Sequence, residues 1–594
     1  MRDQKAENLL NLALATPEPE REKTDELYVG YNIEAKTWEL IVKYHGELLE
    51  VLKEWFPAVQ AEFLLNNYAI LLVPETEVEA VIALPQIEYA EKPKRLFFAV
   101  NQAKTASCLL PVQTGAAGLT GKGVLAAVVD SGIDYFHEDF CYENGESRIL
   151  FLADQVTGEV YSREQINEAL KSGSREAARA IVPSQDASGH GTAVAGILAG
   201  NGRESGGRYR GVAWESELIV VRLGAPDPEG FPRTTQLMRG LDFAVRTALE
   251  RGKPLAVNLS FGNTYGSHDG NGLLERYLDS VAQMGQTVIA VGTGNEGGAG
   301  GHGRFLLQEG EWAEAELAVA AYETGFGLQI WKSYEDSIRI SIRNPAGSIT
   351  ETLSRERGAY RLSMGRTELL IYYGEPGPFN MAQEIYIDFV PRGDYVESGN
   401  WSVFFQAEAV SDGRVDLWLP SAAVLNRSTR ILRPEPETTL TIPSTAQRVI
   451  SVGAYDDSTK AYAPFSGRGD TRHYQIQKPD LAAPGVGIIA PRRGGGYEPV
   501  TGTSFAAPFV TGAAALLMEW GIVRGNDPYL YGDKIKAYLR KGAEQIPAEL
   551  EYPNPRLGYG VLCVEKSLPE GWRELLVLLR RFFQKIFAFL TEKT

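Results

Sequence analysis

Most of the chain alternates between two kinds of apolar pattern. Short, fully apolar runs such as Leu125–Val129 and Leu218–Val221 are typical of strands that are buried on both faces. Between such runs lie longer segments of helical spacing, and the clearest covers Thr235–Glu250. Alternating buried strands and amphipathic helices predict a doubly wound parallel sheet. We expect this α/β fold over residues 98–303 and again over residues 437–568.

The stretch between these two parts has a different pattern. From residue 304 to residue 436, short alternating segments such as Ser337–Ile342, Glu384–Phe389 and Trp401–Phe405 are separated by turn residues. This spacing predicts an all-β sandwich inserted into the α/β domain. The insertion carries no histidine and no cluster of catalytic residue types, so we expect it to be structural or to offer a surface to a partner.

The N-terminal part predicts a small unit of its own. Trp38–Tyr44 and Tyr68–Val73 alternate as strands do, whereas Leu48–Trp55 and Thr76–Leu84 have helical spacing. We expect an α+β unit here, preceded by a charged segment that prolines interrupt.

The C-terminal tail predicts an amphipathic helix over Trp572–Leu590. Leu575, Leu579 and Phe583 lie on its apolar face, and Arg580 lies off it. Such a helix can dock on the body of the protein, bind a partner or lie on a membrane surface. The sequence leaves all three open.

Composition narrows the possible functions. The 594-residue chain has a formal net charge of −17, which argues against a nucleic-acid-binding protein. Cys108, Cys141 and Cys563 are odd in number and widely spaced, so we expect buried thiols and a reducing compartment rather than disulfides or a zinc site. The apolar run Leu9–Ala15 is short and follows acidic residues, so we expect no secretory signal and synthesis in the cytoplasm. No run reaches the ~18 apolar residues of a membrane span.

A serine at the start of a buried helix is the first candidate for catalysis. Gly502 permits a tight turn, Ser504 follows it, and Phe505–Met518 is small and apolar. The hydroxyl would lie at the positive end of the helix dipole, which favours a nucleophile. A plain N-cap is the alternative, because serine is a preferred capping residue.

Two further motifs favour catalysis. Asp130 ends an apolar strand before a glycine turn, and His190 lies between glycines at the start of a small-residue helix. A serine nucleophile needs a base, and a histidine base needs a carboxylate that fixes its tautomer and supports its positive charge. The chain order Asp130, His190, Ser504, with the residues around each, resembles the subtilisin-like serine proteases, or subtilases. The resemblance implies a serine endopeptidase that hydrolyses peptide bonds.

The resemblance implies further site residues. Asn295 follows an apolar strand, and the matching asparagine of subtilases donates a hydrogen bond to the tetrahedral oxyanion. A turn asparagine is the alternative for this residue. Other segments resemble the edge that pairs with substrate main chain and the primary specificity pocket, in which an acidic side chain would favour a basic or polar residue. The substrate-binding residues so implied are Ser260, Phe261, Gly262, Gly294 and Glu296.

Calcium is the one cofactor that the resemblance raises. Asp139 matches a calcium ligand of the family, and the neighbouring His137 is expected to be structural rather than catalytic. The loop that should complete the site, Asn201–Arg208, contains two arginines that would repel a dication. We therefore expect no metal ligands and no cofactor, with calcium as the alternative.

The order of the domains resembles one subgroup, the Csp-type spore-germination proteases. The resemblance divides the chain into a ferredoxin-like propeptide (1–97), two catalytic parts (98–303 and 437–568), an inserted jelly roll (304–436) and a C-terminal helix (569–594). In that subgroup a Csp protease activates a cortex-lytic enzyme by removing its pro-segment, and the propeptide commonly stays bound after cleavage. The implied partners are a protein or peptide substrate, a pro-enzyme among them, and the chain's own propeptide. Packaging in the spore is the matching location.

The same residues leave other functions open. The complete triad predicts an active enzyme that cuts its own propeptide within Lys94–Lys104. The alternatives are a latent scaffold whose propeptide stays in the cleft, and a peptide ligase that uses the same triad. A regulatory or adhesive role is the alternative for the N-terminal unit.

Overall fold

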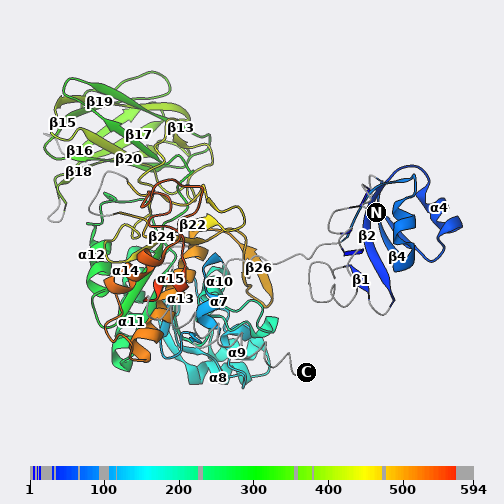
Figure 1. Cartoon of the computed structure of the whole chain (residues 1–594). Coiled ribbons are helices and arrows are strands. Elements are labelled where there is room, and N and C mark those ends of the chain that lie inside the picture. Colours follow the sequence, from blue (N-terminus) through cyan, green and yellow to red (C-terminus); the bar gives the residue numbers. More distant parts are fainter. Residues whose placement is uncertain are drawn as a thin grey trace. The chain divides into compact units, whose positions relative to one another are not determined.

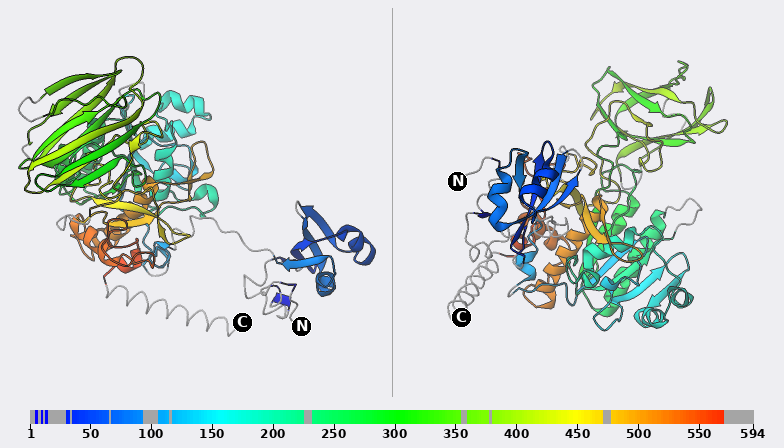
Figure 2. Two further views of the ribbon diagram at one scale, coloured as in Figure 1. Left: turned by 90° about the horizontal axis from the view of Figure 1, so that it is seen from above. Right: turned by 90° about the vertical axis from the view of Figure 1, so that its right-hand side faces the viewer.

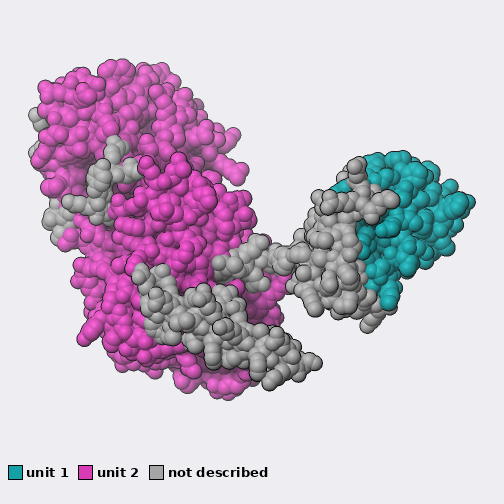
Figure 3. Space-filling view, in the orientation of Figure 1, with its two compact units in different colours: residues 1–98 teal, residues 99–594 magenta. Residues whose placement is uncertain are grey.

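The computed structural model shows two compact units, residues 1–98 and residues 99–594 (Figures 1 and 3). The C-terminal segment predicted as an amphipathic helix and the expected cleavage segment Lys94–Lys104 lie outside the described residues. The structure describes residues 5–6, 10, 13–14, 30–32, 35–64, 67–92, 106–114, 117–224, 232–353, 359–376, 380–470 and 477–569.

After the short strand β1, the N-terminal unit has the βαββαβ order of a ferredoxin-like fold, as predicted. Its strands form one antiparallel sheet in the order β1-β2-β4-β3, with β5 also paired to β2. The inward residues of β2, Trp38, Leu40 and Val42, pack in one core with Leu48 and Leu52 of α4. The elements are β1 (Tyr31–Asn32), β2 (Thr37–Tyr44), α4 (Leu48–Trp55), β3 (Gln60–Leu64), β4 (Tyr68–Pro74), η2 (Glu75–Glu77), α5 (Val78–Ile82) and β5 (Ile87–Glu91).

A nine-stranded sheet forms the centre of the second unit. Its order is β23-β22-β11-β10-β6-β9-β7-β8, and β24 pairs with β22. The inner strands are parallel, and only the edge strands β8 and β23 run antiparallel to their neighbours. The strands are β6 (Leu125–Asp130), β7 (Ile149–Asp154), β8 (Glu159–Ser162), β9 (Glu217–Arg222), β10 (Leu255–Leu259), β11 (Thr287–Gly292), β22 (Ile450–Asp456), β23 (Ala461–Tyr462) and β24 (Leu481–Pro484).

Helices cover both faces of this sheet, which confirms the predicted doubly wound α/β fold. Ala126 and Val128 of β6 pack with α10 and α13 on one face, and Leu125, Ala127 and Val129 pack with α11 and α12 on the other. The helices and short turns are α7 (Leu110–Gln113), η3 (Glu138–Phe140), α8 (Arg163–Lys171), α9 (Arg175–Ile181), α10 (His190–Ala199), η4 (Arg203–Ser205), α11 (Thr234–Arg251), α12 (Leu273–Val281), α13 (Thr503–Met518), η6 (Glu519–Val523), α14 (Asp533–Gly542) and α15 (Val564–Ser567). A hairpin of β25 (Ile488–Pro491) and β26 (Tyr497–Val500) precedes α13.

Helix α13 is a core helix in spite of its composition. Together with η6 it forms a stretch, Thr503–Val523, that by length and apolarity could cross a membrane, but 89% of its most apolar window is buried inside the protein.

The insertion is an all-β domain of two antiparallel sheets, as predicted (Figures 1 and 2). One sheet has the order β12-β20-β14-β18-β17-β16 and the other β15-β19-β13-β21. Both contribute to one core, in which Trp401, Phe405 and Phe389 are among the largest buried side chains. The assignment of the insertion as a jelly roll stays a prediction. The strands are β12 (His302–Leu306), β13 (Trp312–Val319), β14 (Phe326–Ser333), β15 (Ser337–Arg343), β16 (Ala359–Met364), β17 (Thr367–Tyr373), β18 (Ala382–Pro391), β19 (Gly399–Ala409), β20 (Arg414–Trp418) and β21 (Arg430–Ile431).

Two of the three cysteines are joined, and our prediction of free thiols was wrong for them. Cys108 and Cys563 form a disulfide although 455 positions separate them along the chain. Spacing could not reveal this pair, because only the fold brings the segment before β6 next to the segment after β24, where Val564 N donates to Ser107 O over 3.0 Å. Cys141 is a buried free thiol, as predicted. The disulfide also removes the argument for a reducing compartment.

We expect reduction of this disulfide to destabilise the second unit. The bond closes a very long loop in the unfolded chain, and such cross-links typically contribute about 2–4 kcal/mol. Thermal unfolding of the Ser504→Ala protein should therefore show a lower Tm in dithiothreitol. The Cys108→Ser variant lacks the disulfide, so its Tm should be low even without dithiothreitol and should not change when dithiothreitol is added. An equal Tm for the untreated and reduced protein, with three titratable thiols in both, would show that the bond does not form.

Candidate active site

The carboxylate and the imidazole of the predicted triad are in contact. Asp130 is the last residue of β6 and His190 the first of α10, so both lie at the carboxyl edge of the parallel sheet, where ligands bind in such folds. His190 Nδ1 lies 2.7 Å from Asp130 Oδ1, and Asp130 is fully buried. Because a carboxylate can only accept, Nδ1 carries the proton and Nε2 is the basic nitrogen.

The surroundings of His190 make it a stronger base. Burial alone would lower its pKa, but the charge of Asp130 and the hydrogen bond to it raise the pKa above its ordinary value. The charge of Asp186 acts in the same direction.

Asp186 holds the turn that carries His190, and sequence analysis missed it. Its Oδ1 accepts from Ser131 Oγ (2.8 Å) and Gly189 N (2.9 Å), and its Oδ2 accepts from Thr192 N (2.8 Å) and Thr192 Oγ1 (2.6 Å). A buried carboxylate with these four donors fixes the first turn of α10. The signal in the sequence is an aspartate four positions before the histidine, in a turn rich in serine and glycine.

Ser504 lies in the first turn of α13, after Gly502 (φ +149°), as predicted. Its hydroxyl donates to Ser260 O over 3.3 Å, and Ser260 Oγ donates to Ser504 O over 3.1 Å. The ring of Phe505, the residue after Ser504, has its centroid 5.2 Å from that of the His190 ring, so the turn that carries the serine lies beside the histidine. Among the described residues, no hydrogen bond joins Ser504 to His190. Catalytic hydrogen bonds of free enzymes commonly tighten only when substrate binds.

Asn295 has the orientation that an oxyanion donor needs. Its Oδ1 accepts from Thr503 N (3.1 Å) and from Thr503 Oγ1 (3.2 Å). Both contacts fix which end of the amide is the oxygen, so the NH₂ group is left to donate toward the cleft. The adjacent Gly294 has φ +84°, and a Cβ there would come within 2.3 Å of Thr441 Cγ2, which accounts for the glycine.

One cavity brings the predicted substrate-binding residues together. A cleft of about 440 Å³ contains Ser504, Asn295 and all five of these residues in its wall. Asp130 and His190 are not part of that wall, but the ring of Phe261 lies 6.0 Å from the ring of His190. The structure therefore brings the five predicted substrate-binding residues to one cavity. These five are Ser260, Phe261, Gly262, Gly294 and Glu296.

A loop of the insertion, between β20 and β21, supplies a wall of this cavity that no pattern in the sequence indicated. Ser421, Ala422 and Ala423 line the cleft. Glu296 Oε1 accepts from Ser421 Oγ (2.6 Å), and its Oε2 accepts from Ala422 N (3.2 Å). The carboxylate is therefore held against this wall. The insertion, which we expected to be structural or to offer a surface to a partner, also contributes to the cleft.

Two family models match the chain in succession. Residues 4–94 match the Csp protease B prodomain. Residues 121–389 and 391–560, which are more than half of the chain, match the subtilase family. The chain belongs to the subtilase family.

One solved structure matches most of this chain. The solved structure of the Clostridium perfringens CspB protease is 38% identical, with a TM-score of 0.75, and the match covers 80% of this chain and 97% of that chain. This chain is therefore a Csp-type subtilase. The minor extracellular protease Vpr of Bacillus subtilis is 25% identical over 68% of this chain and 46% of its own length. Subtilisin E of the same species is 26% identical over 42% of this chain and 55% of its own length. The chain thus spans about half the length of these two relatives.

The residues around the calcium ligand expected of a subtilase do not fit a calcium ion. Both carboxylate oxygens of Asp139 accept from the Tyr497 hydroxyl at 2.9 Å, and Oδ1 also accepts from Glu204 N at 3.1 Å. Buried His137 lies 3.0 Å from Glu204 Oε2, which agrees with the predicted structural role. Protein donors occupy the oxygens that a calcium ion would need.

We expect Asn295→Ala to lower kcat for a peptide substrate by about 10²–10³, with little change in KM. The size is that of subtilisin, where removal of one oxyanion donor has been measured, and is not obtained from this structure. Asn144→Ala removes an asparagine outside the cleft wall and is the matched control. Equal kcat values for the two variants would contradict the oxyanion role.

We expect the acid limb of kcat/KM to lie above pH 6.5, the ordinary pKa of histidine. His190 must be neutral to accept the serine proton, so activity is lost as pH falls through its raised pKa. Asp130→Asn removes the charge that raises this pKa and should move the limb to lower pH besides lowering the rate. If the acid limb of kcat/KM lies at the same pH in Asp130→Asn as in the wild type, the assignment of this limb to His190 paired with Asp130 is contradicted.

Proposed function

We propose that this subtilase is a serine endopeptidase that works through an acyl-enzyme. The observation that carries the proposal is the contact of His190 with buried Asp130, beside the helix turn that carries Ser504. Asn295 and Ser504 line one cleft next to this pair. A nucleophile, a base, a charge behind the base and an oxyanion donor are the groups that acyl transfer requires.

The mechanism assigns a role to each of these residues. His190 Nε2 takes the hydroxyl proton as Ser504 Oγ attacks the peptide carbonyl, and Asp130 stabilises the imidazolium. Asn295 Nδ2 and the main-chain N–H of Ser504 donate to the oxyanion. His190 protonates the leaving amine, the acyl-enzyme forms, and water repeats the sequence to release the acid.

Substrate binding would itself release the nucleophile. Ser260 lies just after β10 at the sheet edge, and its carbonyl accepts the Ser504 hydroxyl in the free protein. A substrate main-chain N–H that donates to Ser260 O would compete for this acceptor. Ser504 Oγ would then turn to His190 Nε2, so the base and nucleophile would pair when substrate is present.

The first substrate in this proposal is the chain's own propeptide. The Csp protease B prodomain match ends at residue 94, where the expected cleavage segment begins. The second is a protein zymogen, such as a spore cortex-lytic enzyme, in line with the 38% identity to a CspB protease.

A latent scaffold is the second candidate. It is favoured by the hydrogen bond that directs the Ser504 hydroxyl to Ser260 O. In that case the propeptide would stay in the cleft, and Ser504 would never pair with His190.

We expect the intact mass of the purified protein to distinguish the two. The wild type should be split within Lys94–Lys104, and Ser504→Ala should stay whole, because only Ser504 can form the acyl-enzyme. Ser458→Ala removes an exposed serine hydroxyl outside the cleft wall, so it is the matched control that should still be cut.

If both wild type and Ser504→Ala stay whole, the scaffold is supported. If both are cut alike, another protease made the cut, and a peptide substrate must be used to test Ser504 directly.

A further inference from the structure

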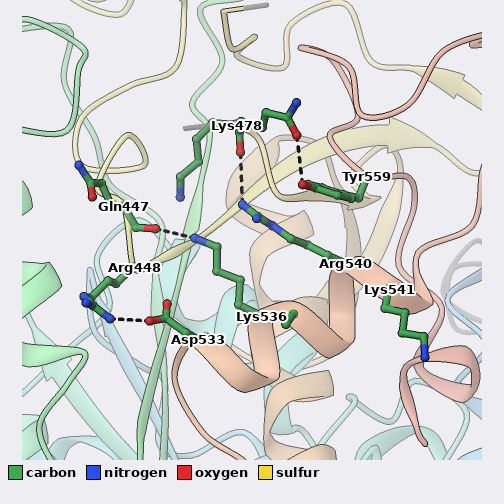
Figure 4. A pocket seen from close by; sticks show the side chains of 10 residues that line it. Gln447, Arg448, Lys478, Asp533, Lys536, Arg540, Lys541 and Tyr559 are labelled. Carbon is green, nitrogen blue, oxygen red and sulfur yellow. Dashed lines mark hydrogen bonds and ion pairs between the residues drawn. The ribbon is translucent and has the colours of Figure 1, made fainter. Parts of the chain in front are cut away.

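A second cavity lies at the opposite edge of the parallel sheet. The candidate active site lies at the carboxyl ends of the strands, where Asp130 ends β6 and where Ser260 and Asn295 follow β10 and β11. This cavity, of about 660 Å³, is lined by residues that precede β22 and β24 and by one face of α14 (Figure 4). Because β22 and β24 are parallel to β11, the cavity lies at the amino edge of the sheet, away from the cleft.

Cations dominate the lining. The lining contains one carboxylate, Asp533, the first residue of α14, which forms an ion pair with Arg448. A second carboxylate, that of Asp480, is fully buried and contacts the lining residue Lys478. The cationic residues of the lining are Arg448, Lys478, Lys536, Arg540 and Lys541.

One buried carboxylate has to balance three of these cations. Asp480 Oδ2 accepts from Lys478 Nζ at 3.0 Å. Asp480 Oδ1 accepts from Arg540 Nε at 2.6 Å and lies 3.3 Å from Lys536 Nζ. Figure 4 shows these three cationic side chains pointing toward one another, so the centre of the cavity has an excess of positive charge.

The main chain fixes the cations in place. Lys478 Nζ donates to Val449 O at 2.8 Å, and Lys536 Nζ donates to Gln447 O at 2.5 Å. Among the described residues, Nη1 of Arg540 makes no hydrogen bond, whereas its Nε and Nη2 do. Holding a charged Lys478 in this place is costly. Its burial, together with the charges of Lys536 and Arg540, lowers its pKa to about 7. Fixed cations with a free guanidinium nitrogen are suited to an oxyanion.

We propose that this cavity binds a small multivalent oxyanion, a molecule that carries phosphate or carboxylate groups. The ligand would accept from Arg540 Nη1 and supply the negative charge that Asp480 alone does not. The chain as a whole carries a net charge of −17, so this concentration of cations is local and not a general attraction for anions.

The test is calorimetric titration of the full chain. The chain carries Ser504→Ala, because this change removes self-cleavage and makes the result independent of the proposed protease activity. Sulfate at millimolar concentration is the first probe, followed by inorganic phosphate and citrate, against sodium chloride of equal ionic strength. We expect saturable binding of one sulfate, weakened at least about tenfold by Arg540→Gln. Arg448→Gln, which does not contact Asp480, should also weaken it and is the second variant in case Arg540→Gln does not fold. Arg246→Gln removes an exposed arginine of α11 and should bind as the parent does.

The probes also distinguish the two ligand sources. Phosphate bound more tightly than citrate supports a phosphate-bearing ligand, and the reverse supports a polycarboxylate. The proposal is overturned if sulfate, phosphate and citrate give no more heat than sodium chloride. It is equally overturned if Arg540→Gln and Arg448→Gln bind as tightly as Arg246→Gln, or if only an acidic peptide such as hexaglutamate binds.

Binding should also depend on pH through Lys478. The charged groups that face its ammonium are Asp480 on its own segment and Lys536 and Arg540 on α14. With a pKa of about 7, Lys478 gains charge as pH falls, while sulfate keeps its charge from pH 6 to 8. Sulfate affinity should therefore be higher at pH 6 than at pH 8, with proton uptake on binding, and an affinity that rises with pH would contradict this arrangement.

Discussion

The buried charge of Asp130 is the constraint on which the rest of the active site depends. Oδ1 accepts from His190 Nδ1 and from Ser131 N, each at 2.7 Å, and among the described residues no donor reaches Oδ2. A buried carboxylate with so few donors is costly unless a positive charge forms beside it. In the proposed mechanism, proton transfer from Ser504 to His190 creates that charge, so the arrangement that is costly in the resting protein would stabilise the imidazolium.

Close approach of small residues is what allows the histidine and serine helices to meet this carboxylate. A Cβ at Gly191 would lie 2.2 Å from Gly132 O, and one at Gly196 would lie 2.2 Å from a ring carbon of Pro491. On α13, a Cβ at Gly512 would lie 2.5 Å from Val212 Cβ. The small-residue pattern of both helices is therefore a packing requirement, and it places their first turns at the edge of the sheet. The glycines are as necessary to the triad as the residues that react.

The sequence was informative wherever the deciding signal is local. Asp130 ends an apolar strand, Ser504 begins an apolar helix, and Asn295 follows another strand, so each could be placed on its element and assigned a role by resemblance. The Cys108–Cys563 bond and the wall formed by Ser421–Ala423 could not be found in this way. Both depend on chain segments that only the complete fold brings together, and neither involves a spacing that a motif could record. The direction of the Ser504 hydroxyl is likewise a matter of tertiary contact with Ser260.

The position of the insertion explains why its β20–β21 loop belongs to the cleft. The chain leaves the catalytic fold just after Asn295 and Glu296, and it returns past Ser421 to Thr441, whose N–H donates to Thr293 O at 2.9 Å. Thr264 Oγ1 donates to Leu419 O at 2.9 Å, and the ring of His268 stacks on Trp418 with centroids 4.3 Å apart. These contacts anchor the returning segment immediately before the residues that hold Glu296. The packing of the β domain on the catalytic fold thus sets one wall of the cavity beside Ser504, and a change at that junction would alter this wall without touching Asp130, His190 or Ser504.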